Sequence, residues 1–188
     1  MLILRDIAPA PESIRHSVLA LGNFDGLHLG HRAVLDKARQ IAKDEDRPFT
    51  VMTFHPHPRR FFNPSLPPLT MMSLQEKATA LKTMGVQCLW LMRFNNPFCK
   101  LTANAFIEDL LVDMLRVHHI VTGENFVFGY QRGGNISFLQ QKMRERVVKH
   151  TAVPPCIVAG DMCSSTRLRQ VLQSADMEMA AQLLGRPY

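Results

Sequence analysis

The fold is decided by residues 18–43, which read VLALGNFDGLHLGHRAVLDKARQIAK. The apolar run at 18–21 predicts a buried strand, and the apolar spacing over 30–43 predicts a helix. The turn between them is rich in glycine, which lets the backbone approach a ligand closely. A helix N-terminus that follows such a turn offers unsatisfied N–H groups and a positive dipole end, which is typical of a phosphate site. His28 and His31 add donors that can neutralise charge on a phosphoryl group.

The rest of the chain alternates short apolar runs with segments of helical period. We expect further strands at 49–54, 86–92, 119–122 and 157–159, a proline-containing loop at 63–70, and helices beginning at Ser73 and Thr102 and covering 137–146, 165–173 and 177–184. Alternation of this kind with near-continuous apolar strands predicts an α/β fold. The expected architecture is a Rossmann-like, doubly wound parallel sheet of about five core strands with helices on both faces.

Four polar clusters directly follow predicted strands, at 22–31, 55–60, 123–133 and 160–169. In open parallel sheets, ligands bind beyond the carboxyl ends of the strands, where the strand order switches. We therefore expect these clusters to form one shared site.

Each cluster also has a purely structural interpretation. The HLGH stretch at 28–31 lacks the glutamate of a zinc-protease motif, so the alternative to phosphate binding is two surface histidines at a helix start. The SSTRLR stretch at 164–169 suits a triphosphate through its hydroxyls and guanidinium groups, but it also reads as an ordinary helix cap. The prolines of 55–58 stiffen either a histidine site or a simple turn. The glycines and aromatics of 123–134 fit either a slot for a planar ring or a loop that Phe126 and Phe128 anchor to the core.

Composition narrows the class of protein. A length of 188 residues, of which 46% are hydrophobic, indicates one globular domain. No apolar run approaches the roughly 18 residues of a membrane span, and the first residues do not read as a signal peptide. The four cysteines match no zinc spacing, so we expect reduced thiols and a cytoplasmic protein. The net charge of +6 is spread along the chain, which favours a positive cleft for phosphates over a nucleic-acid or membrane partner.

Four motifs in order resemble the adenylyltransferase module of the bacterial FAD synthetase family. They are GxFDGxHxGH at 22–31, TFxPHPR at 53–59, GxNFxFGxxRxG at 123–134 and SSTRxR at 164–169, and the stretch from Phe94-Asn95 to Leu101 and Phe106 is similar to a further family segment. The resemblance runs from about residue 17 to the C-terminus. Cys163 stands where the family usually has isoleucine, and Asn125 where it often has aspartate.

The resemblance implies the nucleotidyltransferase superfamily fold and a reaction in which ATP and FMN give FAD and pyrophosphate. It implies catalytic roles for His28, His31 and Arg169, ATP binding by Gly22, Asn23, Phe24, Asp25, Gly30, Ser164, Ser165 and Thr166, and FMN binding by His57, Asn125, Phe128 and Arg132. Mg²⁺ is expected to bridge substrate phosphates without a protein metal site.

The family resemblance also bears on domain organisation. We expect residues 1–188 to form a single FMN adenylyltransferase domain without the riboflavin kinase module, because no GFPTAN motif occurs. Two alternatives stay open: another adenylyl- or cytidylyltransferase, acting on pantetheine phosphate, nicotinate mononucleotide or glycerol phosphate, and a flavin-nucleotide binding module without turnover. The sequence gives no indication of an oligomeric state.

Overall fold

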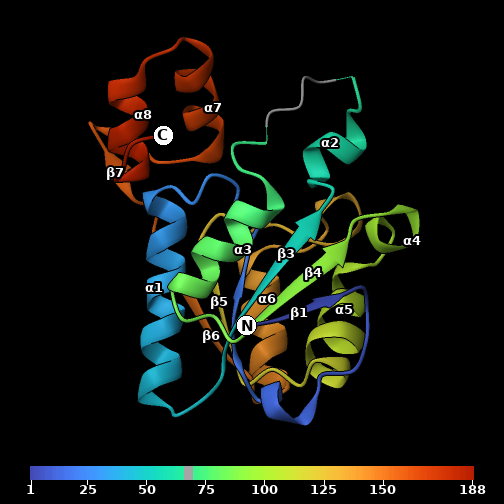
Figure 1. Ribbon diagram of the computed structural model, residues 1–188. Helices are drawn as coiled ribbons and strands as arrows, with labels where there is room; N and C mark the ends of the chain where they lie inside the picture. The colour runs from blue at the N-terminus through green and yellow to red at the C-terminus, as the bar shows by residue number, and fades with distance from the viewer. Residues whose placement is uncertain (66–69) are drawn as a thin grey trace.

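The computed structural model describes residues 1–65 and 70–188, and within them six strands form one parallel sheet (Figure 1). The strands are β1 (Leu2–Arg5), β2 (Val18–Leu21), β3 (Phe49–His55), β4 (Cys88–Arg93), β5 (His119–Gly123) and β6 (Lys149–Val153). Their order in the sheet is β1-β4-β3-β2-β5-β6, and every neighbouring pair is parallel. The chain therefore winds outward from β2 in both directions, and the strand order switches between β2 and β5.

The central strands are apolar because both faces of the sheet are covered. All four residues of β2 are buried, as are the first five of β3 and β4. Helices α1 (Leu29–Asp44) and α3 (Leu74–Thr83) cover one face, where Val34, Leu35 and Leu81 pack on the sheet. The other face carries α4 (Asn96–Cys99), α5 (Ala103–Ala105), the π-helix η2 (Phe106–Met114) and α6 (Ile136–Glu145). The expected doubly wound α/β fold is confirmed.

Local capping explains where the expected helices begin. Ser73 and Glu76 form a reciprocal capping box at α3, as the sequence predicts. The Thr102 side chain caps α5, which continues as η2 with wider π-type hydrogen bonding, so the predicted helix from Thr102 is present to Met114. The helices α2 (Pro58–Phe62), η1 (Glu12–Ile14) and η3 (Tyr130–Arg132) are short connections. Part of the predicted loop at 63–70 lies outside the described residues, at 66–69.

The strand predicted at 157–159 is not part of the main sheet. Ile157–Val158 forms β7, which pairs antiparallel with β8 (Asp161–Met162) in a separate ribbon. The position in the sheet belongs instead to β6, whose sequence KHTAV is too polar to stand out as a strand. An edge strand has one strand neighbour and is covered incompletely, so a polar sequence is tolerated there. The short edge strand β1 brings the sheet from the expected five strands to six.

The last two helices, α7 (Ser165–Gln173) and α8 (Met177–Leu184), pack on each other around a small core of their own. Leu168, Ala180 and Leu183 are fully buried there, apart from both sheet cores. Figure 1 shows this helix pair above the N-terminal end of α1, at the end of the sheet toward which β3 and β4 point. No helix in the described ranges has the length and apolar character needed to cross a membrane.

Candidate active site

Two helix N-termini meet at the carboxyl end of the sheet. His28 caps α1, and its Nδ1 accepts a hydrogen bond from the backbone N–H of His31 at 3.3 Å. Because Nδ1 accepts, the neutral ring carries its proton on Nε2, which lies 3.3 Å from the Ser165 hydroxyl in the first turn of α7. The motifs at 22–31 and 164–169 are thus in direct contact, although 137 residues separate the two side chains.

The two histidines of the first motif are stacked. Their ring centroids are 3.7 Å apart with an interplanar angle of 18°, and Phe24 meets His31 edge-on at 5.4 Å. Burial lowers the pKa of His28 to about 4, with Asp25 opposing the shift and Arg169 adding to it. Burial and the neighbouring His28 hold the pKa of His31 well below its usual value. Both rings are therefore neutral at pH 7, and within the described part of the chain the buried His31 Nδ1 has no hydrogen-bond partner.

A buried ion pair forms a second link between the two motifs. Arg169 Nη2 donates to Asp25 Oδ2 at 2.6 Å, and the two side chains are only 8% and 3% exposed. The other carboxylate oxygen of Asp25 accepts from the backbone N–H of Met71 at 3.1 Å. Arg169 also donates to the Ser165 carbonyl at 3.4 Å. Arg169 is thus oriented by Asp25 and α7, and its direct contact with a phosphate stays a prediction.

The loop between β2 and α1 is held by contacts that the sequence did not reveal. The Asn23 carbonyl accepts from the Thr53 hydroxyl at 2.8 Å and from the Lys77 ammonium at 2.9 Å. Phe24 is buried and has a positive φ of 48°, which keeps the turn tight. A side chain at Gly30 would put a Cβ 3.0 Å from the Cys163 carbonyl and 3.2 Å from the His28 ring. The third glycine of the motif therefore permits the close approach of the C-terminal segment.

Gly22 and the remaining ATP candidates lie around this contact. A Cβ on Gly22 would stand 3.1 Å from the Phe24 ring, so the absence of a side chain lets that ring fold over the turn. Ser164 caps α7 by accepting from the Arg167 N–H at 3.2 Å. Thr166 is exposed on the first turn of the same helix.

The residues expected to bind FMN are more dispersed. His57 caps α2 by accepting from the Arg59 N–H at 3.1 Å, and burial lowers its pKa to about 4, with Asp25 opposing and Arg169 and Lys77 reinforcing the shift. It therefore lies within electrostatic reach of the ion pair. Asn125 and Arg132 are exposed on the glycine-rich loop after β5.

Phe128 lies mostly in the core. It is 8% exposed, and its ring stacks on Phe126 and packs against Phe106 at centroid distances of 5.4 and 5.3 Å. Its observed role is to anchor the loop, as the structural interpretation of 123–134 expects, and its flavin contact stays a prediction.

Sequence reasoning missed Lys77 and the position of Cys163. Lys77 lies on the inward stripe of α3 between Leu74 and Leu81, so a lysine at a core-facing position was the available signal. The Cys163 thiol is buried 3.6 Å from His28 Nδ1 and 3.4 Å from the Leu183 carbonyl. Burial raises its pKa, so it fills space as a neutral thiol.

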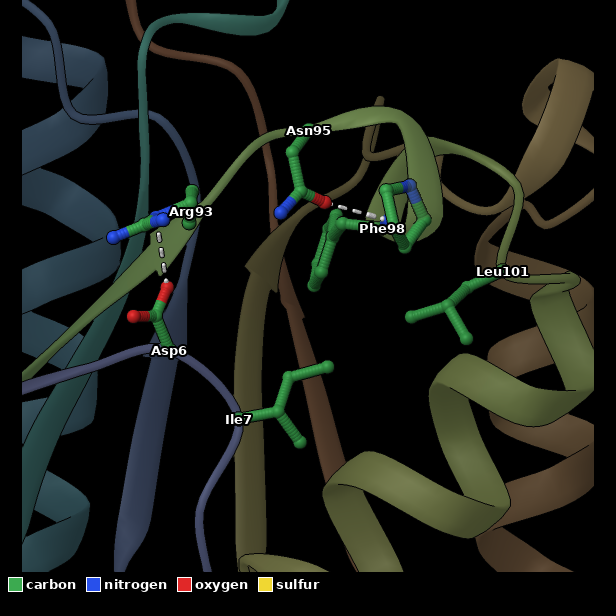
Figure 2. A pocket seen from close by; sticks show the side chains of 7 residues that line it. Asp6, Ile7, Arg93, Asn95, Phe98 and Leu101 are labelled. Carbon is green, nitrogen blue, oxygen red and sulfur yellow. Dashed lines mark hydrogen bonds and ion pairs between the residues drawn. The ribbon is translucent and has the colours of Figure 1, made fainter.

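A cavity of about 380 Å³ lies beyond the carboxyl ends of β1 and β4 (Figure 2). Its lining comprises Asp6, Ile7, Arg93, Asn95, Pro97, Phe98 and Leu101. Figure 2 shows the Arg93–Asp6 ion pair, 3.2 Å long, on one side and the apolar side chains of Ile7, Phe98 and Leu101 around the hollow. The Leu101 carbonyl accepts from Tyr130 N, so the cavity borders the glycine-rich loop.

The fold and the paired helix N-termini define an α/β protein of the nucleotidyltransferase type, with a site suited to phosphate groups. The chain belongs to the FAD synthetase family, whose model matches residues 10–167.

Curated relatives agree with this assignment, and solved structures agree with the fold. The chain is 36% identical over 98% of its length to the bifunctional riboflavin kinase/FMN adenylyltransferase of Escherichia coli K12, and 35% identical over its whole length to that of Pseudomonas fluorescens. The chain covers 58% and 60% of the length of those two proteins, which is about three fifths of each. A structure described as a macrolide-efflux protein from Streptococcus pneumoniae superposes with a TM-score of 0.87 at 28% identity, covering all of this chain and 71% of that one.

More distant structures share the fold alone. Pantoate-β-alanine ligase from Francisella tularensis superposes with a TM-score of 0.53 at 12% identity, covering 98% of this chain and 85% of that one.

Proposed function

We propose that this chain transfers AMP from ATP to FMN, giving FAD and pyrophosphate. The observation that carries the proposal is the contact between the α1 and α7 N-termini through His28 and Ser165. Two helix N-termini that converge on one point concentrate N–H donors and positive dipole ends, as a polyphosphate requires. The family relatives are named for this activity, which supports FMN as the acceptor.

The reaction needs alignment and charge neutralisation more than proton removal. An oxygen of the FMN phosphate attacks the α-phosphorus of ATP, the new P–O bond forms, and the bond to the bridging oxygen breaks as pyrophosphate leaves with the electron pair. The FMN phosphate is already anionic, so no general base is needed. We assign His28 and His31 to the triphosphate, with His31 nearest the reacting phosphoryl group, where fixed donors stabilise developing charge. Bound phosphates raise histidine pKa values, so the two rings become stronger donors as ATP arrives.

The described residues offer few ligands for a metal ion at this site. Among the described residues, no group of three or more His, Cys, Asp or Glu side chains could hold a metal ion, and the Asp25 carboxylate is engaged by Arg169. An Mg²⁺ ion would be held here mainly by the substrate phosphates, and when bound it would neutralise part of their charge. Ser164, Ser165, Thr166 and Arg169 are proposed to hold the β- and γ-phosphates from α7.

The FMN side is assigned to the loops after β3 and β5. We propose that His57, Asn125 and Arg132 position the FMN phosphate and ribityl chain, and that the exposed edge of Phe128 borders the ring. The half-buried His57 lies within electrostatic reach of the Asp25–Arg169 pair, which supports a place for the FMN phosphate beside the ATP site.

We further propose that residues 1–188 act as one adenylyltransferase domain without riboflavin kinase activity, located in the cytoplasm with ATP and FMN as its partners. The FAD synthetase family model, which matches residues 10–167, supports an adenylyltransferase domain, and the four free cysteines fit a reducing compartment.

The experiment is incubation with FMN, ATP and Mg²⁺, followed by chromatography for FAD and an assay for pyrophosphate. Equimolar FAD and pyrophosphate are expected, and riboflavin with ATP should give no FMN. Parallel reactions with pantetheine phosphate, nicotinate mononucleotide and glycerol phosphate test the other transferase assignments. Pyrophosphate release with one of these and none with FMN would overturn the proposed acceptor, and binding of ATP and FMN without turnover would indicate a non-catalytic module.

A further inference from the structure

Lys77 is a buried cation that the proposed mechanism does not use. It lies on the inward face of α3, is only 8% exposed, and donates one hydrogen bond from Nζ to the Asn23 carbonyl at 2.9 Å. An ammonium has three donors and no acceptor. In the described part of the chain, no carboxylate forms an ion pair with it. The nearby carboxylate of Asp25 is already held by Arg169 at 2.6 Å.

Burying an ammonium without a counter-charge is costly, so buried charges are normally paired. Burial lowers the pKa of Lys77, while Asp25 opposes that shift. At this end of the sheet two buried cations, Arg169 and Lys77, therefore share one buried carboxylate. The surplus positive charge is explained if an anion completes the site when it binds.

The position of Lys77 identifies the class of anion. Its ammonium touches the loop that leads to His28 and His31, and its charge lowers the pKa of both His31 and His57. It thus lies within reach of the ATP side and the FMN side of the proposed site. One ring nitrogen there, His31 Nδ1, is also buried without a hydrogen-bond partner in the described structure, and in its protonated form it can donate to an anion. These are the features of a cradle for phosphoryl oxygens.

We propose that Lys77 is a phosphate-binding residue of this site, whose ammonium donates to a phosphoryl oxygen of the bound nucleotide while keeping its bond to the Asn23 carbonyl. The assignment rests on the proposed function for the identity of the nucleotide. A merely structural lysine would only brace the loop, as the Thr53 hydroxyl does at the same carbonyl. The two roles make different predictions for anion binding.

The test is titration of the protein with pyrophosphate by calorimetry. Lys77→Gln keeps a donor for the Asn23 carbonyl but removes the charge, and we expect it to weaken pyrophosphate binding about tenfold or more. Lys77→Arg should retain most of the affinity. Thr53→Val removes the other brace on Asn23 and should change the affinity by less than about threefold. Lys82→Gln, an exposed lysine on the same helix, is the matched control and should bind as the wild type does.

Each outcome decides the assignment. Wild-type affinity in Lys77→Gln, or an equal loss in Thr53→Val, would overturn it. Urea unfolding checks that each variant folds, and Lys77→Met replaces Lys77→Gln if that variant does not. The titration needs no FMN, so it separates the two proposals. If no FAD forms but Lys77→Gln loses pyrophosphate, the acceptor is wrong and the Lys77 assignment stands; if FAD forms and pyrophosphate binding is unchanged, only the Lys77 assignment fails.

Discussion

Replacing Asp25 with asparagine should destabilise the protein far more than a typical charge removal. The substitution puts an amide against the Arg169 guanidinium, where a carboxylate oxygen now accepts at 2.6 Å. Both side chains are below 10% exposed, so water does not replace the lost partner. Lys77 also loses the one negative charge that opposes its desolvation. Breaking a buried pair by removing one partner costs roughly 3–5 kcal/mol, and this geometry belongs in that range.

The assay is urea unfolding followed by the fluorescence of Trp90, the single tryptophan, which is 2% exposed on β4. The matched control is Asp36→Asn, which breaks the 2.9 Å pair with Arg39 on the surface of α1, where both side chains are about half exposed. Exposed pairs contribute roughly 0.2–1 kcal/mol, so this control should scarcely move the unfolding midpoint.

A double-mutant cycle isolates the interaction. Arg169→Met removes the cation, and in the double variant the asparagine no longer faces a guanidinium. We expect a coupling energy between Asp25 and Arg169 above about 1 kcal/mol. A loss of free energy of unfolding in Asp25→Asn that is no larger than the loss in Asp36→Asn would refute a strong buried ion pair.

Three further substitutions or conditions test other parts of the structure. His31→Ala should lower the rate of FAD formation roughly 10²-fold in a protein that still folds, because it removes one fixed donor at the reacting phosphoryl group; an unchanged rate refutes its role. His28 has a pKa of about 4 in the folded protein and an ordinary value of 6.5, so the unfolded state binds the proton first. The contribution of His28 to stability should therefore fall by up to roughly 3 kcal/mol as pH drops from about 6.5 to 4, and His28→Gln should make the pH dependence shallower by that contribution in urea titrations at several pH values. Gly129→Ala would place a Cβ 2.6 Å from Ala103 N at a φ of 75°, and it should lower the free energy of unfolding by roughly 2–4 kcal/mol. Gly85→Ala, at a φ of 87° with open space around it, should lower the free energy of unfolding only through its unfavourable backbone conformation. Equal losses in the two variants would show that the structure relieves the steric overlap at Gly129.

Much of the fold was predictable because its signals are local. The apolar run at 18–21, the turn after it and the helix behind it are adjacent in the chain, and so are Ser73 and Glu76 of the capping box. The strand β6 was missed because an edge strand tolerates polar residues. The opposite error occurred at Ile157, where an apolar residue is 60% exposed on a two-residue ribbon.

The site was predictable as a set of segments but not as a set of contacts. The motifs at 22–31 and 164–169 were expected to meet, and the His28–Ser165 contact confirms it. Asp25 and Arg169 are 144 positions apart, and nothing in the sequence around either residue shows that they form an ion pair with each other. The burial of Lys77 depends likewise on how α3 docks over the β2–α1 loop, which periodicity alone does not specify.

Because α7 and α8 have a small core of their own, the site lies between two cooperative units, the sheet with its helices and the α7–α8 pair. One side of the site, with His28 and His31, packs on the sheet. The other side, with Ser165 and Arg169, belongs to a helical pair whose core contains few side chains. A unit of that size detaches at a lower free energy than the sheet unfolds. Activity should therefore be lost under milder conditions than those that unfold the sheet, because local unfolding of α7 and α8 removes one side of the site while the sheet stays folded.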